Sequence, residues 1–141
     1  MPDSRRLLAI DYGDRRIGLA VSDPTGTIAS PAGHVLRRRG KRPPVAELVR
    51  RAVELGVAGV VLGLPLDASG SETPRSAEVR AIGAAIAART GLPVRYVDER
   101  YTTASAHRAV EALGGSTRGR KGDIDALAAT VLLQHALALS D

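Results

Sequence analysis

Three acidic residues stand at positions where an α/β chain concentrates its chemistry. Asp11 ends the apolar run "LLAI", Glu99 stands just past the run "PVRYV", and Asp125 falls in the first turn of a predicted C-terminal helix. Ligands of open α/β sheets bind at the carboxyl ends of the strands. We therefore expect Asp11 and Glu99 to meet at one edge of a sheet.

The helical spacing around Asp125 predicts that its carboxylate points inward. Its neighbours three, four and seven residues on are Ala128, Ala129 and Leu132, all apolar. An inward carboxylate is costly unless it is paired, protonated or bound to a cation, and three clustered acids repel one another without a cation between them. Oxygen ligands in a chain without cysteine and without a convincing histidine pair favour Mg²⁺ or Mn²⁺.

Each acid also has a simpler interpretation. Asp11 could serve only as a turn former, and Glu99 could pair with Arg95 or Arg100. Asp125 could be an acid favoured by the dipole at a helix N-terminus. The case for a metal site therefore rests on the expected convergence of the three side chains.

The apolar pattern predicts the elements that must position these acids. The first forty residues alternate apolar runs with turn signals such as "DYGDRR" and "DPTG", which is typical of an antiparallel meander. From residue 43 the apolar residues follow helical spacing, with Pro and Gly at the helix ends. We expect strands at 7–10, 17–21, 27–36, 59–65 and 93–97. We expect helices from residue 45 to Gly56, from Pro74 to Gly91, from Thr102 or Thr103 to Gly114, and from about Asp123 onward. Residues 114–122, basic and without an apolar side chain, are predicted to form a mobile loop.

The order of these elements predicts a single α/β domain over residues 1–141. A meander followed by strand–helix–strand units implies one mixed five-stranded sheet with helices on both faces. No apolar run reaches the ~20 residues of a membrane span, and "MPDSRR" lacks the apolar core of a signal peptide. We therefore expect a cytoplasmic protein without a membrane partner.

The composition favours a polyanionic partner. Lys and Arg total 20 against 15 acids, a net charge of +5, although a solvated basic surface would give the same sum. The aromatic residues are three tyrosines, too few for a platform that stacks many bases. Binding of nucleic acid would therefore depend on charged side chains and on backbone contacts.

Four segments, taken in order, resemble the motifs of the YqgF family: "AIDYGDRRIGLAVSD", "VVLGLPLDASGSETP", "VDERYTT" and "KGDIDALAA". The resemblance extends from about residue 7 to residue 138. Members of that family are described as Holliday-junction resolvase-like proteins and as nucleases that process pre-16S rRNA, with a ribonuclease H-like fold. The resemblance implies that Asp11, Glu99 and Asp125 form the acidic triad, and it selects Asp125 over Asp123.

The function implied is metal-dependent hydrolysis of phosphodiester bonds in structured nucleic acid. Two cations ~4 Å apart would activate water and stabilise the leaving oxygen, with Asp11 shared between them. The first expected substrate is the 5′ end of precursor 16S rRNA, with ribosomal particles as partners; the alternatives are a four-way DNA junction and a non-catalytic RNA-binding role. The chain would act as a monomer or a homodimer. A phosphate loop of the sugar-kinase type is a further alternative, which the length of 141 residues disfavours.

Several residues beside the acids are candidates for binding nucleic acid. Arg15, Arg16 and Lys121 flank two of the acids, while the basic cluster at 37–42 lies further off. Backbone amides of the loop at 65–74 could receive a phosphate, although a simple capped connection explains the same sequence. The remaining candidates are Ser71, Arg100, Thr102 and Thr103.

Overall fold

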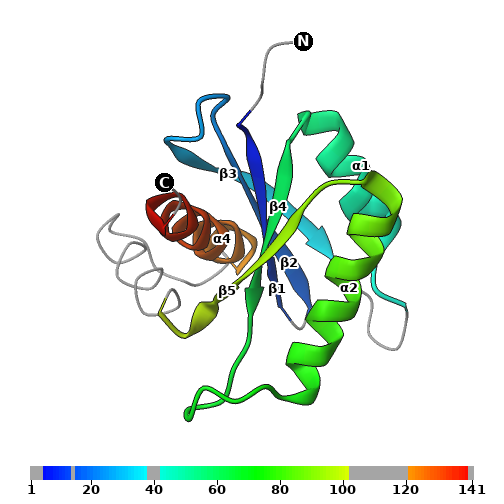
Figure 1. Ribbon diagram of the computed structural model, residues 1–141, viewed down its shortest axis with the longest axis vertical. Coiled ribbons are helices and arrows are strands. Elements are labelled where there is room, and N and C mark those ends of the chain that lie inside the picture. The colour runs from blue at the N-terminus through cyan, green and yellow to red at the C-terminus, as the bar shows by residue number, and fades with distance from the viewer. Residues whose placement is uncertain (1–4, 14, 38–41, 102–120, 140–141) are drawn as a thin grey trace.

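The computed structural model describes residues 5–13, 15–37, 42–101 and 121–139 (Figure 1), and for Tyr101 and residues 121–125 the backbone alone. One five-stranded sheet has the order β3-β2-β1-β4-β5. β1 pairs antiparallel with β2 and β2 with β3, while β4 is parallel to both β1 and β5. The predicted meander and the mixed sheet are therefore confirmed.

The strands are β1 (Leu7–Tyr12), β2 (Arg16–Ser22), β3 (Ala29–Leu36), β4 (Gly59–Leu64) and β5 (Val94–Asp98). The helices are α1 (Val45–Leu55), α2 (Pro74–Thr90), the short 3-10 helix η1 (Glu99–Tyr101) and α4 (Lys121–Leu139). The last helix begins at Lys121 rather than at about Asp123, so the end of the predicted loop at 114–122 is wrong. The predicted helix from Thr102 or Thr103 to Gly114 lies outside the described residues.

Helix ends follow the local signals in the sequence. The side chain of Thr73 caps α2 by accepting from the Ser76 amide, and Ser76 Oγ accepts from the Thr73 amide in return. This reciprocal pair satisfies donors that a helix start otherwise leaves open. α1 and α2 end at Gly56 and Gly91, whose φ of 63° and 73° glycine adopts without strain. The Ser76 hydroxyl also donates to the backbone oxygen of Pro65, which holds the first turn of α2 at the carboxyl end of β4.

The two faces of the sheet are covered by different helices (Figure 1). α1 and α2 pack on one face, where Leu8, Ile10 and Leu62 are fully buried with Leu48 of α1. α4 packs on the other face, mainly on small or β-branched side chains: Ala9, Ala20, Val61 and Val97. Because side chains alternate along a strand, Asp11 shares the α4 face with Ala9. No helix among the described residues is long and apolar enough to cross a membrane.

Candidate metal centre

Asp11 and Glu99 lie together at the carboxyl ends of the parallel strands, as predicted. Ile10 of β1 pairs with Leu62 of β4, which brings Asp11 level with Gly63. Gly63 in turn pairs with Val97 of β5, and Glu99 follows Val97 by two residues, on the same face. The two carboxylates therefore stand on either side of Gly63, and their hydrogen bond is one cause of the shifted pKa of Glu99.

Glycines on both neighbouring strands leave space around these acids. Asp11 pairs with Gly18 of β2 on one side and stands level with Gly63 of β4 on the other. A Cβ atom at Gly63 would lie 2.7 Å from Oε2 of Glu99 and 3.2 Å from Cδ2 of Leu132. Any larger residue at position 63 would therefore displace the Glu99 carboxylate or the helix that packs over it.

The surroundings of Glu99 raise the pKa of its carboxyl group to about 8. Burial is the largest cause, followed by the charge of Asp11 and the hydrogen bond with it, while the charge of Arg75 acts in the opposite direction. Two carboxyl groups so placed share a proton at neutral pH, because both cannot be ionised cheaply side by side. A divalent cation between them would remove this penalty, and their oxygen atoms are the ligands that Mg²⁺ and Mn²⁺ prefer. The donor set therefore fits a hard divalent ion.

Asp125, the third predicted acid, lies in α4, and its side chain is outside the described part of the chain. It precedes Ala129, Leu132 and Ala136 by four, seven and eleven residues, and these three are buried against the sheet. Leu132 contacts the backbone region of Gly63. The described residues alone contain no group of three acidic or histidine side chains that could hold a metal ion. The participation of Asp125 therefore stays a prediction.

Arg75 is a site residue that the sequence analysis missed. It lies in the first turn of α2, and its Nη2 donates to the backbone oxygen of Tyr12, next to Asp11, at 2.9 Å. Its charge also lowers the pKa of Glu99. The available signal was positional: a helix that follows a parallel strand begins at the carboxyl edge of the sheet, so a cation in its first turn reaches that edge.

The strand end that carries Asp11 is tied to α2 by a cluster of three side chains. The Tyr12 hydroxyl donates to Oε1 of Glu78 at 3.2 Å, and Arg37 forms an ion pair with the same oxygen. The Arg37 guanidinium stacks on the Tyr12 ring, 4.4 Å from its centroid, and Nη1 donates to the Gly13 oxygen at 3.3 Å. Burial raises the pKa of Tyr12 to about 12, so its hydroxyl remains a donor. Arg37, the first residue of the predicted basic cluster at 37–42, is thus engaged within the chain.

The turn after β1 is tight, as its glycine predicts. The Gly13 amide donates to the Arg16 oxygen at 3.1 Å, and a Cβ atom at Gly13 would lie 2.4 Å from that oxygen. Arg15 is exposed beyond this turn and Arg16 is half-buried. Both follow the turn at the end of the strand that carries Asp11, while Lys121, Thr102 and Thr103 have side chains outside the described residues.

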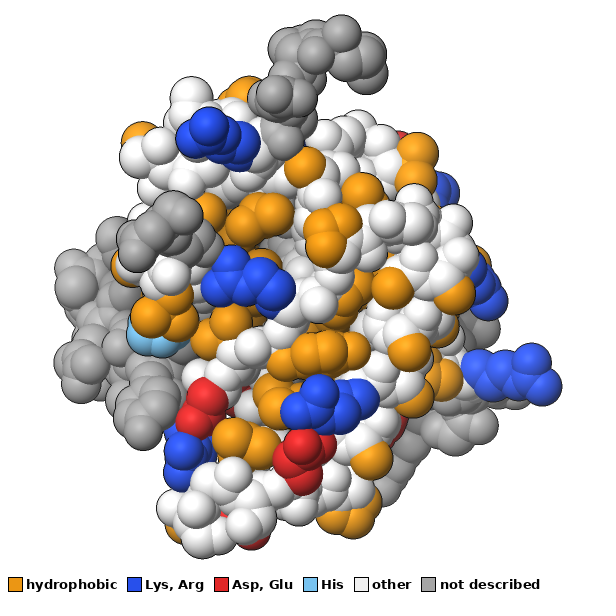
Figure 2. Space-filling model, viewed as in Figure 1, with side chains coloured by type: hydrophobic (Ala, Val, Ile, Leu, Met, Phe, Trp, Pro, Cys, Tyr) orange, Lys and Arg blue, Asp and Glu red, His pale blue; other side chains and the backbone are white. Residues whose placement is uncertain are grey.

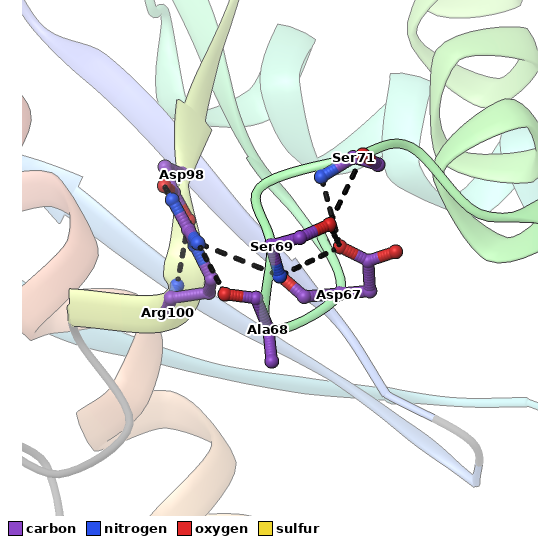
Figure 3. A network of polar contacts seen from close by, with 6 residues as sticks. All are labelled: Asp67, Ala68, Ser69, Ser71, Asp98 and Arg100. Carbon is purple, nitrogen blue, oxygen red and sulfur yellow. Dashed lines mark hydrogen bonds and ion pairs between the residues drawn. The ribbon is translucent and has the colours of Figure 1, made fainter.

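The loop between β4 and α2 uses its backbone amides internally (Figure 3). Oδ1 of Asp67 accepts from the amides of Ser69 and Ser71 at 3.0 and 2.9 Å and from the Ser69 hydroxyl at 2.7 Å. The Gly70 amide donates to the Asp67 backbone oxygen at 3.0 Å. The hydrogen bonds from Ser69 and Ser71 to its carboxylate lower the pKa of Asp67. The geometry favours the capped connection over a phosphate-binding loop.

Several arginine side chains on the described surface form ion pairs with nearby acids. On α1, Arg50 pairs with Glu47 and Glu54, and Arg51 pairs with Glu47. Arg80 of α2 pairs with Glu72 through two hydrogen bonds. On the face shown in Figure 2, Lys and Arg side chains form separate patches, and the larger acidic patches lie in its lower half. These contacts fit the solvated-surface interpretation of the basic residues on α1.

Comparison with known proteins gives consistent matches. A family model described as "RuvX: Holliday junction resolvase" matches residues 5–139. A "Putative pre-16S rRNA nuclease" of Clavibacter michiganensis subsp. michiganensis is 43% identical over 130 residues, covering 92% of this chain and 81% of that protein. A protein of the same name from Kineococcus radiotolerans is 44% identical over 133 residues, covering 92% and 70%.

A solved structure titled "T. thermophilus RuvC in complex with Holliday junction substrate" matches with a TM-score of 0.58. The match covers 95% of this chain and 94% of that one at 16% identity. At this identity the likeness concerns the fold alone, and it confirms the predicted ribonuclease H-like architecture.

Proposed function

Because this chain belongs to the RuvX Holliday junction resolvase family, we propose that it is a metal-dependent endonuclease acting on precursor 16S rRNA. The observation that carries the proposal is the pair of hydrogen-bonded carboxyl groups of Asp11 and Glu99 at the carboxyl edge of the sheet. The rRNA substrate is supported by the names of relatives more than 40% identical to this chain. A role in ribosome biogenesis would place the protein in the cytoplasm, with ribosomal particles as partners.

The acids would hold two divalent cations, Mg²⁺ or Mn²⁺. Asp11 would be the shared ligand, since it lies on the central strand of the sheet with neighbours on both sides. Glu99 and Asp125 would each complete one coordination shell. A cation bound there supplies Lewis acidity that activates water and stabilises the leaving oxygen.

The remaining residues would bind and orient the nucleic acid. Arg15 and Arg16 follow the turn beside Asp11, and Lys121 begins the helix that carries Asp125. Each would contact phosphate oxygens, which position a substrate without reading its sequence. We assign the same role to Thr102, Thr103 and the hydroxyl of Ser71. Binding should therefore weaken as the salt concentration rises, because phosphate contacts release counterions.

A second candidate substrate is the four-way DNA junction named in the description of the family model. Symmetric cleavage of such a junction requires two active sites related by a two-fold axis, and hence a homodimer. The rRNA substrate requires one active site and is compatible with a monomer. The oligomeric state in solution therefore bears on the choice between the two substrates.

The test is a side-by-side cleavage assay on precursor 16S rRNA and on a four-way junction, with Mg²⁺ or Mn²⁺. The wild type is expected to cut the rRNA, and Asp11→Asn to bind it without cutting. Glu54→Gln, which removes an acid from the exposed surface of α1, is the matched control and should cut normally. Binding of RNA without cleavage of either substrate would instead indicate a non-catalytic RNA-binding protein.

A further inference from the structure

The side chain of Arg100 is held within the chain by three sets of acceptors (Figure 3). Nε lies 3.1 and 3.0 Å from the two carboxylate oxygens of Asp98, and Nη2 donates to Oδ2 of the same residue at 2.7 Å. Nη1 faces the backbone oxygens of Asp67 and Ala68 at 3.5 and 3.4 Å. Each guanidinium nitrogen thus has an acceptor inside the protein.

The loop that Arg100 reaches is already closed by its own hydrogen bonds. The Asp67 carboxylate accepts from the amides of Ser69 and Ser71, and the backbone oxygens of Asp67 and Ala68 face Arg100, just past the end of β5. Gly70 has a φ of +87°, which favours glycine, and the guanidinium packs against it: a Cβ atom there would be in ordinary van der Waals contact, 3.4 Å from both terminal nitrogens. The loop and the guanidinium therefore fit against each other through backbone atoms.

Glu99 lies between the two residues of this ion pair. The Arg100 amide donates to Oδ1 of Asp98 at 3.0 Å, which closes the start of η1. The residues before and after Glu99 are thus tied both to each other and, through Arg100, to the β4–α2 loop. The backbone of Glu99 is therefore held on both sides, which sets the direction in which its Cα–Cβ bond leaves the chain.

We propose that Arg100 is a positioning residue that connects the β4–α2 loop to the metal ligand Glu99, rather than a contact for nucleic acid. The inference rests on the proposed function, because it assigns Glu99 the role of a ligand. It replaces the expectation that Arg100 binds phosphate. Arginine suits the role because its planar fork binds a carboxylate through two nitrogens and still offers a third to the loop.

The first test is steady-state cleavage of precursor 16S rRNA by Arg100→Ala, Arg100→Lys and Asp98→Ala. Loss of a residue that orients a metal ligand costs about 10- to 100-fold in activity, so kcat should fall by that factor with KM nearly unchanged. Arg100→Lys should not restore kcat, because a single ammonium group cannot bind the Asp98 carboxylate and the loop carbonyls at the same time as the planar guanidinium does. The double variant Asp98→Ala/Arg100→Ala should lose less activity than the two single losses combined, since both single variants remove the ion pair between Asp98 and Arg100.

The matched control is Arg50→Ala, which removes an equal charge and a comparable ion pair on the surface of α1. It should leave kcat and KM unchanged. RNA affinity is measured in the Asp11→Asn background as a function of salt. A phosphate contact would give Arg100→Ala weaker binding and a shallower salt slope, with Arg100→Lys close to wild type, and that result would overturn the proposal.

A second readout is independent of catalysis. Amide hydrogen exchange at Ser69 and Ser71 should accelerate in Arg100→Ala and Asp98→Ala but not in Arg50→Ala, and the Mn²⁺ affinity should fall in the first two. Unchanged exchange in both variants would contradict the proposal. If the wild type cuts neither substrate, the proposed function fails, whereas the exchange and Mn²⁺ measurements still decide the role of Arg100.

Discussion

Oε2 of Glu99 lies 2.7 Å from the point where a side chain at Gly63 would begin. The glycine belongs to β4, and the acid follows the end of β5. Their approach depends on the register in which Gly63 pairs with Val97, two residues before Glu99. The space beside Asp11 therefore exists because residue 63 of β4, the strand between β1 and β5, has no side chain.

Gly63→Ala is expected to displace the Glu99 carboxylate. The added methyl group would overlap Oε2 of Glu99 and crowd Leu132, at a cost of about 1–3 kcal/mol in stability. Mn²⁺ affinity, measured by calorimetry, should fall at least about 10-fold. Gly59→Ala is the control, because its Cβ would meet the flexible end of Leu7, at the far end of β4. A folded Gly63→Ala protein with wild-type Mn²⁺ affinity would rule out Glu99 as a ligand.

The metal-free protein should lose stability as the pH rises from about 4.5 to about 8. In the unfolded chain Glu99 releases its proton near the ordinary glutamate pKa of 4.5, whereas the folded protein retains it up to a pKa of about 8. The folded state then binds more protons than the unfolded state, so the free energy of unfolding declines across this window. The loss attributed to Glu99 is on the order of 3 kcal/mol after allowance for its partial exposure.

Urea denaturation in a metal chelator at several pH values measures this effect. Glu99→Gln should flatten the pH dependence between 4.5 and 8, because the amide cannot ionise. Glu54→Gln, on the exposed surface of α1, should retain the wild-type profile. An unchanged profile in Glu99→Gln would show that another group is responsible.

Asp11→Asn is expected to fold normally without metal and to melt at the same or a higher temperature at pH 8. The substitution removes one of two carboxylates that repel each other, so the gain is about 1–2 kcal/mol, or a few degrees in Tm. The increase in Tm that Mn²⁺ gives the wild type should disappear. A large loss of stability in the metal-free variant would instead mean that Asp11 is a structural turn former.

Arg75→Met should raise the pKa of Glu99 further, because the guanidinium is the charge that favours the ionised form. The carboxyl carbon shift of Glu99, followed by NMR in the absence of metal, reports this pKa directly. Arg89→Met is the control, since Arg89 lies in the last turn of the same helix. A shift toward lower pH in Arg75→Met would contradict the placement of Arg75 beside the acids.

The sequence predicted the elements that carry the site because their signals are local. Thr73, Gly56 and Gly91 mark helix ends through their own backbone preferences, and the structure confirms all three. The meeting of Asp11 and Glu99 was predictable because parallel strands bring their carboxyl ends to one edge.

The contributions of Gly63 and Arg75 were not predictable in the same way. The contribution of Gly63 depends on the register between β4 and β5. The contribution of Arg75 depends on how far its long side chain reaches around the end of the sheet. Asp67 presents a similar case, since its carboxylate takes the loop amides that the sequence left open for a phosphate. Such pairings lie between segments, and the residues of each segment alone do not determine them.

The strand order has a consequence for the two acids of the proposed metal site. β1, with Asp11, is the middle strand and is bonded to neighbours on both sides, whereas β5, with Glu99 just past its end, is the outer strand of the described sheet. Outer elements open locally at a lower free-energy cost than central ones. We therefore expect Asp11 to be the more firmly held side of the proposed metal site, and the release of a bound ion to begin at Glu99.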